Sequence, residues 1–214
     1  MIYEFPALEC PLRQGDIFSG LPRVEISLRR IPIVTPTGEQ MEAPWEEIMR
    51  DGNPITAILA VNPVTAIIIS QDCDAFQAPD ITLCEIRSFR VVERKSENIT
   101  SVKSWVKIIT QQARLNQKWF YLPPDSQVGF TEKMGVDFHI SLRLPRQDLE
   151  EMRSLRRGRL NEVACAHFRE RIAEFFRRYP YNEWYPLTLE EMTEYQSKYP
   201  DAEAYPWQIG PSRR

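Results

Sequence analysis

The clearest pattern in the chain is an alternation of apolar and polar residues that ends at Pro145. Apolar residues stand at every second position and polar ones between them: Val136, Phe138, Ile140, Leu142 and Leu144, with Asp137, His139, Ser141 and Arg143. A shorter alternation covers 24–31, where the apolar residues Val24, Ile26 and Leu28 would lie on one face of a strand. A period of two residues is typical of a strand with one buried face. Both segments are therefore predicted to be strands.

Other strands are predicted by runs of β-branched and aromatic residues. The stretch from Ala57 to Ser70 is divided by Asn62-Pro63, and its second part, from Thr65, contains no alternating polar residue. Such a strand is buried on both faces. Ile81 to Val92 and Trp119 to Leu122 predict two more strands. The segment 35–54, with three prolines, two glycines and several acids, predicts a loop or an excursion from the barrel or sheet.

The period changes to three and four residues in two places, which predicts amphipathic helices. The first covers 101–115, and its apolar positions are Val102, Trp105, Val106, Ile109 and Ala113. After Pro145 a short apolar face precedes Gly158, and a longer stripe follows it: Leu149, Met152 and Leu155, then Leu160, Ala164, Phe168, Ile172, Phe175 and Phe176. Thr188 to Glu191 is a capping-box pattern that predicts one more short helix. Strands first and helices last favour an α+β fold.

The composition is ordinary for a globular protein, with 43% hydrophobic and 27% charged residues among 214. No apolar run approaches the ~20 residues that cross a membrane, and the N-terminus has no basic or apolar region of a signal peptide. The cysteines form no C-x-x-C pair and match no zinc template: Cys10, Cys73, Cys84 and Cys165. These features predict a cytoplasmic protein with reduced thiols and no membrane segment.

Charge is uneven, although the net charge is only -3. Residues 146–178 carry nine arginines and six acids, whereas the segments before and after each have a net charge of -3. Four arginines cluster around Gly158: Arg153, Arg156, Arg157 and Arg159. Arginine suits bidentate recognition of phosphate, so these residues predict an anionic contact, RNA included. The alternative is a solvated helix face paired with the neighbouring acids.

The most distinctive segment is Ser70-Gln71-Asp72-Cys73-Asp74, because it follows a strand predicted to be buried. Side chains at a strand end reach the surface, where binding sites are often built. The adjacent carboxylates disfavour the thiolate that nucleophilic catalysis by Cys73 needs. Two interpretations stay open. Gln71, Asp72, Cys73 and Asp74 form a recognition surface, or the segment is a tight turn in which an aspartate accepts backbone amides and Cys73 packs inward.

No complete catalytic set is visible. The sequence contains no Gly-rich phosphate loop, G-x-S-x-G elbow or H-E-x-x-H motif. His139 shares a strand face with Asp137 and Ser141, but alternate residues of a strand lie about 7 Å apart, too far for a triad in sequence. His167 is the only other histidine. We therefore expect neither a metal site nor a cofactor.

Several segments together resemble an uncharacterised family of bacterial proteins. They are Gln14-Gly-Asp-Ile17, the strand ending Ser-Gln-Asp-Cys-Asp74, Tyr121-Leu-Pro123, and Arg159-Leu160 with Phe168 and Phe175-Phe176-Arg177 before Pro180. The family combines a Gly-Asp opening, a Ser/Thr-Gln-Asp/Thr-Cys-Asp motif and a helix rich in Arg and Phe. The resemblance covers most of residues 14–180 and implies no established function.

A second resemblance covers roughly residues 14–92. Gly15-Asp-Ile, a strand ending at Ser70 and another from Ile81 to Val92 are similar to the MazF/PemK group of SH3-like barrels. This resemblance implies a small barrel, a dimer and metal-independent cleavage of single-stranded RNA in a toxin–antitoxin setting. The catalytic Arg-Pro pair of that group corresponds to Val64-Thr65 here. An enzyme would therefore use Ser70 or Ser88 with Arg87 or Arg143.

The resulting expectation is one α+β unit in three parts. Residues 10–145 form a small SH3-like β-barrel with a helix inserted near 101–115, 146–178 an Arg-rich helical hairpin packed on it, and 179–214 an aromatic, proline-rich tail. The leading functional hypothesis is a non-enzymatic bacterial recognition module in a stress, toxin–antitoxin-like or phage-defence setting. It would bind a protein partner, a second copy or RNA. The alternative is a divergent MazF-like endoribonuclease.

Overall fold

The computed structural model describes residues 2–112 and 118–177, with 193–194, 197–198 and 200. The chain divides into two compact units, 1–175 and 176–214. The first unit is α+β, as predicted, and all of its sheet pairings are antiparallel. The helix predicted at Thr188 to Glu191 and most of the aromatic tail lie outside the described residues.

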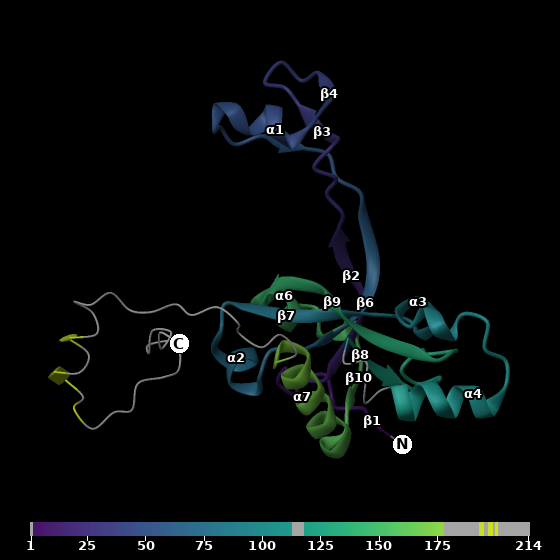
Figure 1. Ribbon diagram of the computed structural model, residues 1–214. Helices are drawn as coiled ribbons and strands as arrows, with labels where there is room; N and C mark the ends of the chain where they lie inside the picture. The colour runs from purple at the N-terminus through teal and green to yellow at the C-terminus, as the bar shows by residue number, and fades with distance from the viewer. Residues whose placement is uncertain (1, 113–117, 178–192, 195–196, 199, 201–214) are drawn as a thin grey trace, which may run out of the picture. The chain divides into compact units, whose positions relative to one another are not determined.

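The main sheet has seven strands in the order β1-β10-β2-β6-β7-β9-β8 (Figure 1). Their bounds are Tyr3–Glu4 (β1), Asp16–Val24 (β2), Val61–Ile68 (β6), Asp80–Ser88 (β7), Trp119–Leu122 (β8), Met134–Pro145 (β9) and Arg156–Leu160 (β10). In the described part of the chain β1 and β8 are its two edges, and they do not pair with each other. The sheet is therefore open, and the prediction of a closed SH3-like barrel is wrong.

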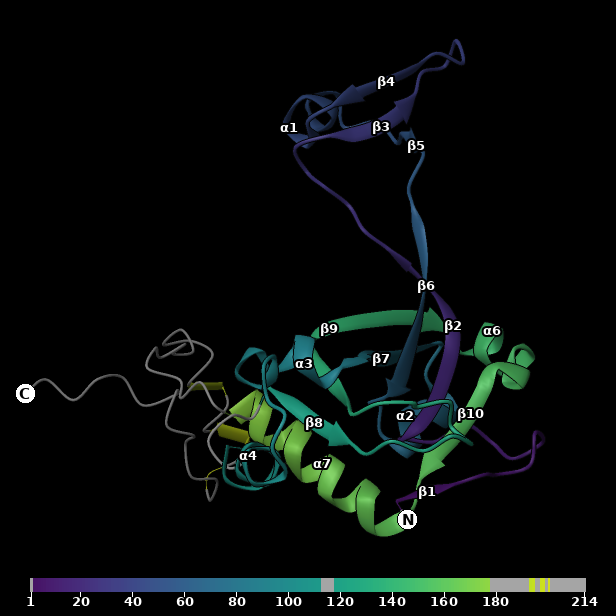
Figure 2. The same ribbon diagram turned by 90° about the vertical axis from the view of Figure 1, so that its right-hand side faces the viewer.

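A second, three-stranded sheet has the order β4-β3-β5 and lies in the connection between β2 and β6. Its strands are Ile31–Val34 (β3), Gln40–Ala43 (β4) and Thr56–Ala57 (β5), and α1 (Trp45–Ile48) with a 3-10 turn at Met49–Asp51 joins the last two. The ends of β2 and β6 pair as far as Val24 and Val61 and lead to this small sheet (Figure 2). We call residues 25–60 the arm.

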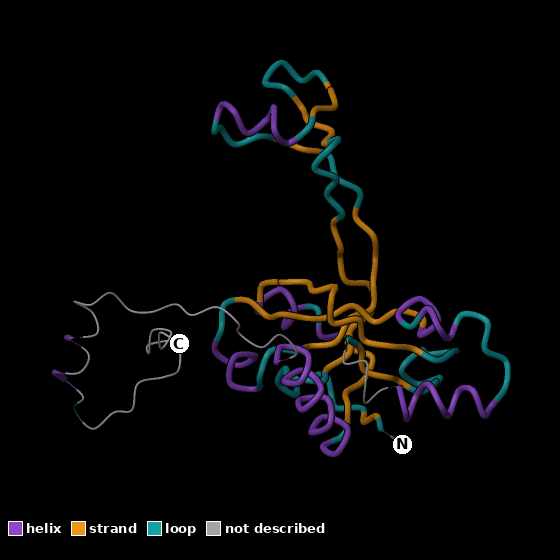
Figure 3. Tube along the Cα trace, viewed as in Figure 1, coloured by secondary structure: helices purple, strands orange, loops and turns teal. Residues whose placement is uncertain are grey.

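Helices complete the first unit (Figure 3). They are α2 (Asp72–Gln77), α3 (Phe89–Val92), α4 (Val102–Val106) continued by a π-helix (Lys107–Gln112), α6 (Arg146–Glu151) and α7 (Glu162–Arg177), with 3-10 turns at Arg94–Ser96 and Arg153–Leu155. The long helix α7 packs Ala164, Cys165 and Phe168 against one face of the main sheet. Ala75 of α2 and Leu149 of α6 pack against the other face.

Because both faces are covered, the central strands are apolar on both sides. Ala66, Ile67 and Ile68 of β6 are fully buried, which confirms the prediction for the second part of that segment. The alternation from 136 to 144 is also confirmed, since β9 spans it and its apolar residues are more buried than the polar ones between them.

Three predicted segments differ from the structure. The strand predicted from Ile81 to Val92 ends at Ser88, because Phe89–Val92 forms the helix α3. β2 ends at Val24, so Ile26 and Leu28 lie in an exposed connection and not in a half-buried strand. The predicted helical hairpin over 146–178 contains a strand, because Arg156–Leu160 pairs with β2 and β1 as β10. Residues 146–175 belong to the same compact unit as the other strands.

Candidate functional site

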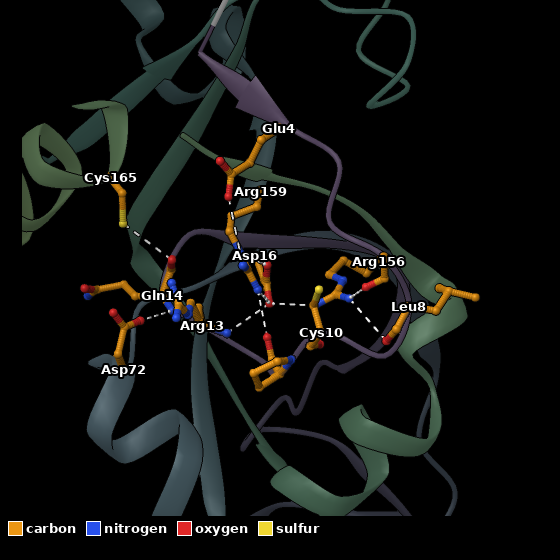
Figure 4. Close-up of polar contacts among 12 residues, drawn as sticks. Glu4, Leu8, Cys10, Arg13, Gln14, Asp16, Asp72, Arg156, Arg159 and Cys165 are labelled. Atoms are coloured by element: carbon orange, nitrogen blue, oxygen red, sulfur yellow. Dashed lines mark hydrogen bonds and ion pairs between the residues drawn. The ribbon is translucent and has the colours of Figure 1, made fainter. Parts of the chain in front are cut away.

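A buried carboxylate joins the start of β2 to β10. Asp16 is fully buried, and its Oδ1 lies 2.5 Å from Nε of Arg159, while Oδ2 accepts Nη2 of Arg159 at 3.0 Å (Figure 4). Nη1 of Arg156 lies 3.3 Å from Oδ2, and the backbone N–H of Arg13 donates to the same oxygen at 3.0 Å. Both oxygens of Asp16 are thus hydrogen-bonded. We call Asp16, Arg156 and Arg159 the arginine clasp.

Asp16 favours the charged form of Arg159 in the clasp. Burial by itself opposes the charged form of Arg159, but the hydrogen bond and the attraction of Asp16 outweigh it and raise the pKa of Arg159. A buried ion pair adds little net stability compared with well-packed apolar residues, whereas removal of one partner costs about 3–5 kcal/mol. The clasp therefore fixes where β10 pairs with β2.

The other guanidinium N–H groups of the clasp hold the segment 7–11 by its backbone. Arg156 donates to the carbonyl oxygens of Ala7, Leu8 and Cys10, and Arg159 donates to that of Pro11 (Figure 4). Arg156 and Arg159 are each only 8% exposed and are paired with Asp16, so they present little surface to the anionic partner that the sequence predicted. The carboxylate buried in β2 requires these cations inside the protein.

The remaining two arginines of the predicted cluster do not share a surface with the clasp. Arg157 is exposed on β10. Arg153 is half-buried, and its Nε has no hydrogen-bond partner among the described residues. The four arginines around Gly158 therefore divide between interior and surface. Arg156 and Arg159 are three residues apart but both reach Asp16, because the strand register shifts between Arg156 and Gly158.

Gln14 connects three segments that are far apart in the sequence. Its backbone N–H donates to Oδ1 of Asp72 at 2.9 Å, and its side-chain Nε2 donates to the carbonyl of Ile69 at 2.7 Å. Arg169 of α7 donates to Oε1 of Gln14 and to Oδ2 of Asp72, each at 2.7 Å. The Gly-Asp opening, the loop after β6 and the C-terminal helix thus meet. Arg169 was not predicted, although it lies one turn after Cys165, whose thiol donates to the carbonyl of Gln14.

The loop 70–74 has features of both interpretations, the tight turn and the exposed recognition surface. Ser70 accepts the backbone N–H of Thr82 at 2.9 Å, and Asp72 accepts that of Gln14, as the tight-turn interpretation requires. Cys73, however, is exposed and does not pack inward. Gln71, Cys73 and Asp74 face solvent on the first turn of α2, beside Phe76, which is 68% exposed. A recognition surface here is therefore smaller than predicted.

Two of the four cysteines are buried, Cys84 and Cys165. Burial, aided by the charge of Asp137, raises the pKa of Cys84 to about 12, and burial also raises the pKa of Cys165. Both thiols are thus protonated near neutral pH and are poor nucleophiles. Within residues 2–112, 118–177 and the few described ones beyond, no group of three or more His, Cys, Asp or Glu side chains is arranged to hold a metal ion.

The four catalytic candidates fall into two pairs at opposite ends of β7. Ser70 binds Thr82, whose partner on β9 is Arg143. Arg143 is held by Asp80, with Nη2 and Oδ2 2.8 Å apart.

Ser88 and Arg87 lie at the other end of β7, about 20 Å from Thr82 at ~3.3 Å per residue. Arg87 is 3.7 Å from the carboxylates of both Glu85 and Asp137. The candidates therefore do not form one catalytic site, and at most one serine–arginine pair stands at each end of the strand.

The arm presents apolar side chains without a core of its own. By register, one face of its sheet carries only apolar residues: Ile31, Ile33, Met41, Ala43 and Ala57. Among the described side chains of the arm, Ile31 and Ala43 are the only apolar ones that are buried.

Across the described residues, nine of the eighteen exposed large apolar side chains lie within 24–61: Val24, Ile26, Leu28, Met41, Trp45, Met49, Ile55, Ile58 and Val61. Contiguous exposed apolar surface of this kind is typical of interaction sites.

The chain was compared with families, curated proteins and solved structures. No family model matches it, and neither does any curated protein or solved structure. In the part of the chain that the structure describes, no helix is long and apolar enough to cross a membrane. The proposed function therefore rests on the geometry of this chain alone.

Proposed function

We propose that this chain is a non-enzymatic recognition module whose arm binds a protein partner. The observation that carries the proposal is the apolar surface of 24–61, which holds half of the exposed large apolar side chains of the described residues. The arm buries so little of its own apolar surface that a partner is the natural source of the missing contacts. Burial of this surface in a complex would supply the driving force for binding.

The charge of the arm favours a partner of a particular chemistry. Residues 25–60 contain six acids and three arginines, a net charge of -3 that equals the net charge of the whole chain. Two arms would repel each other if they packed face to face, so the partner is a different protein. Its surface combines an apolar groove with a rim of lysine or arginine, because such charges are complementary to the arm and speed association.

Other features agree with a recognition role inside a bacterial cell. All four cysteines are free thiols, as expected in a reducing cytoplasm. The exposed side chains of Gln71, Cys73, Asp74 and Phe76 offer a second, smaller contact surface at the end of β6. A stress or phage-defence setting is our working hypothesis for the pathway.

Site-specific photo-crosslinking in cells tests the arm directly. A photoreactive phenylalanine analogue replaces Met41, which is 49% exposed on the apolar face, or Val163, which is 68% exposed on α7. We expect one defined cross-linked protein from position 41 and none from position 163. That protein is then purified and titrated against the full chain by calorimetry.

Two matched variants decide the outcome of the titration. Met41→Asp/Ile58→Asp adds two charges to the arm, and Val102→Asp/Val163→Asp adds two charges elsewhere. The first should weaken binding about tenfold or more, because two buried apolar contacts are lost, and the second should leave it unchanged. The proposal is wrong if both variants bind equally well, if the cross-linked protein is a second copy of this chain, or if position 41 gives no product.

A further inference from the structure

A cleft of about 870 Å³ is lined by residues from the end of β7, from α3 and the turn after it, from β9, and by the residue that precedes β8. Five of its lining residues carry a basic side chain: Arg87, Arg90, Arg94, Lys95 and Lys118. They come from the end of β7, from α3, from the turn Arg94–Ser96 and from the residue before β8. Three acids, Glu93, Glu97 and Asp137, also line the cleft, so its basic groups are in excess.

Two of these acids already bind groups within the protein. Glu93 is only 2% exposed, and its carboxylate accepts the indole N–H of Trp119 at 3.1 Å and the backbone N–H of Lys95 at 3.2 Å. Asp137 accepts the backbone N–H of His139 at 3.1 Å and faces Arg87 at 3.7 Å. Glu97 is the one acid of the lining that stands exposed. The lining therefore carries two more basic than acidic side chains, and two of its three acids already have partners within the protein.

The basic residues divide into structural and available ones. Arg90 donates to the carbonyls of Ser96, Glu97 and Ile99 and lies 5.1 Å from the ring centre of Trp105, which fixes the wall of the cleft.

In contrast, the side-chain nitrogens of Arg94, Lys95 and Lys118 have no hydrogen bond or ion pair with any described residue. Three cations that converge on one hollow without internal acceptors can bind an external anion.

We infer that this cleft binds the phosphate groups of a nucleotide or of a short single-stranded nucleic acid. Its volume falls in the range of small-molecule sites, about 300–1,000 Å³, and exceeds what a single phosphate fills. Lysine and arginine are the residues that recognise phosphate, by point charge and by bidentate hydrogen bonds respectively. The inference is independent of the arm, which lies in a different segment of the chain.

Binding is measured with the full chain and two probes. One probe is a fluorescein-labelled uridine octamer followed by anisotropy, and the other is ATP, measured by calorimetry and as a competitor of the octamer. The cleft variant is Arg94→Gln/Lys95→Gln/Lys118→Gln. Its matched control, Arg13→Gln/Lys103→Gln/Lys107→Gln, removes the same charge from exposed positions outside the cleft. Thermal unfolding verifies that both variants fold.

The cleft variant should lose about tenfold or more in affinity, and its plot of log K against log salt should flatten by about 2, since each single-strand phosphate contact contributes ~0.7. The control should stay within about twofold of the wild type. Displacement of the octamer by ATP identifies nucleotides as the source of the phosphate, and binding of the octamer without displacement identifies the nucleic-acid backbone. The inference is overturned if the wild type binds neither probe, or if both variants weaken equally.

Discussion

The arginine clasp and the arm reverse the usual distribution of charged and apolar residues. In the clasp, one carboxylate and two guanidinium groups are buried, and each finds acceptors or donors in the protein. In the arm, the large apolar side chains are exposed and few contacts bury them. The Gly-Asp opening of the chain thus serves the interior through Asp16, whereas the arm, which carries no recognisable motif, leaves its large apolar side chains exposed to solvent.

The largest effect should come from removal of the carboxylate of the clasp. Asp16→Asn preserves the shape of the side chain but leaves Arg156 and Arg159 buried without their counter-charge. We expect a loss of about 3–5 kcal/mol in the free energy of unfolding, measured by urea titration. Glu25→Gln, an exposed acid at the start of the arm, serves as the control and should change stability little. A loss below about 1 kcal/mol for Asp16→Asn would contradict a structural clasp.

A matched pair of isoleucines compares the main sheet with the arm directly. Ile67→Ala, in the centre of the main sheet, should cost about 2–5 kcal/mol of global stability because it leaves a cavity between packed layers. Ile31→Ala, in the arm, should cost clearly less and act locally, because the arm can open without the main sheet. Urea unfolding measures the first effect, and hydrogen exchange of the arm amides measures the second. Equal global costs would show that the arm folds as part of the main core.

Alkaline pH should destabilise the main sheet through its buried thiol. The pKa of Cys84 is 9.0 for an isolated thiol and about 12 in the native protein. Above pH 9 the unfolded chain loses this proton and the native state keeps it, so stability falls from pH 9 towards 12 by at most about 1.4 kcal/mol per pH unit. Unfolding of the wild type and of Cys84→Ala should be compared between pH 8 and 11. The variant should show the shallower decline, and parallel curves would refute the assignment.

Two glycines test how tightly each region packs. Gly15 and Gly38 both have positive φ, 89° and 85°, so alanine is strained at either position by about 1–2 kcal/mol. At Gly15 an added Cβ would also lie 3.3 Å from Cβ of Leu160, whereas at Gly38 it would meet nothing within 4 Å. Gly15→Ala should therefore lower the melting temperature more than Gly38→Ala. The reverse order would mean that the arm is the more tightly packed region.

The smallest effect concerns the exposed edge of the clasp region. Arg169 and Asp72 lie 2.7 Å apart with side chains about half exposed, so solvent screens their attraction. A double-mutant cycle with Arg169→Gln and Asp72→Asn should give a coupling energy of about 0.2–1 kcal/mol. A coupling of several kcal/mol would indicate that this pair belongs to the buried clasp.

The spacing of apolar residues correctly predicted two strands of the main sheet and most of the helix α7. The alternation before Pro145 became β9, and most of the apolar run from Thr65 became the buried end of β6. The apolar stripe after Asn161 became α7, but Leu160 lies in β10, because the pattern contained both a strand end and a helix start.

Two misjudged regions have specific physical causes. Arg156 and Arg159 resembled surface residues because their counter-charge, Asp16, lies about 140 residues earlier in the chain. The acid between Gly15 and the apolar pair Ile17-Phe18 was the available signal, since a charge at the start of a buried strand requires a partner. A half-buried strand was predicted at Val24, Ile26 and Leu28 because of their alternation. Alternation predicts an apolar face, but it does not show whether another element of the protein covers that face.

The manner in which the clasp holds the segment 7–11 has a consequence for how this protein can change over evolutionary time. Arg156 and Arg159 bind carbonyl oxygens there and no side chain of the segment. Every amino acid supplies a carbonyl, so this attachment is indifferent to residue identity. Substitutions at Ala7 or Leu8 can accumulate without loosening the N-terminal segment, whereas a single change in either arginine releases it. Sequence variation is therefore tolerated in the segment 7–11 and is selected against at the two arginines.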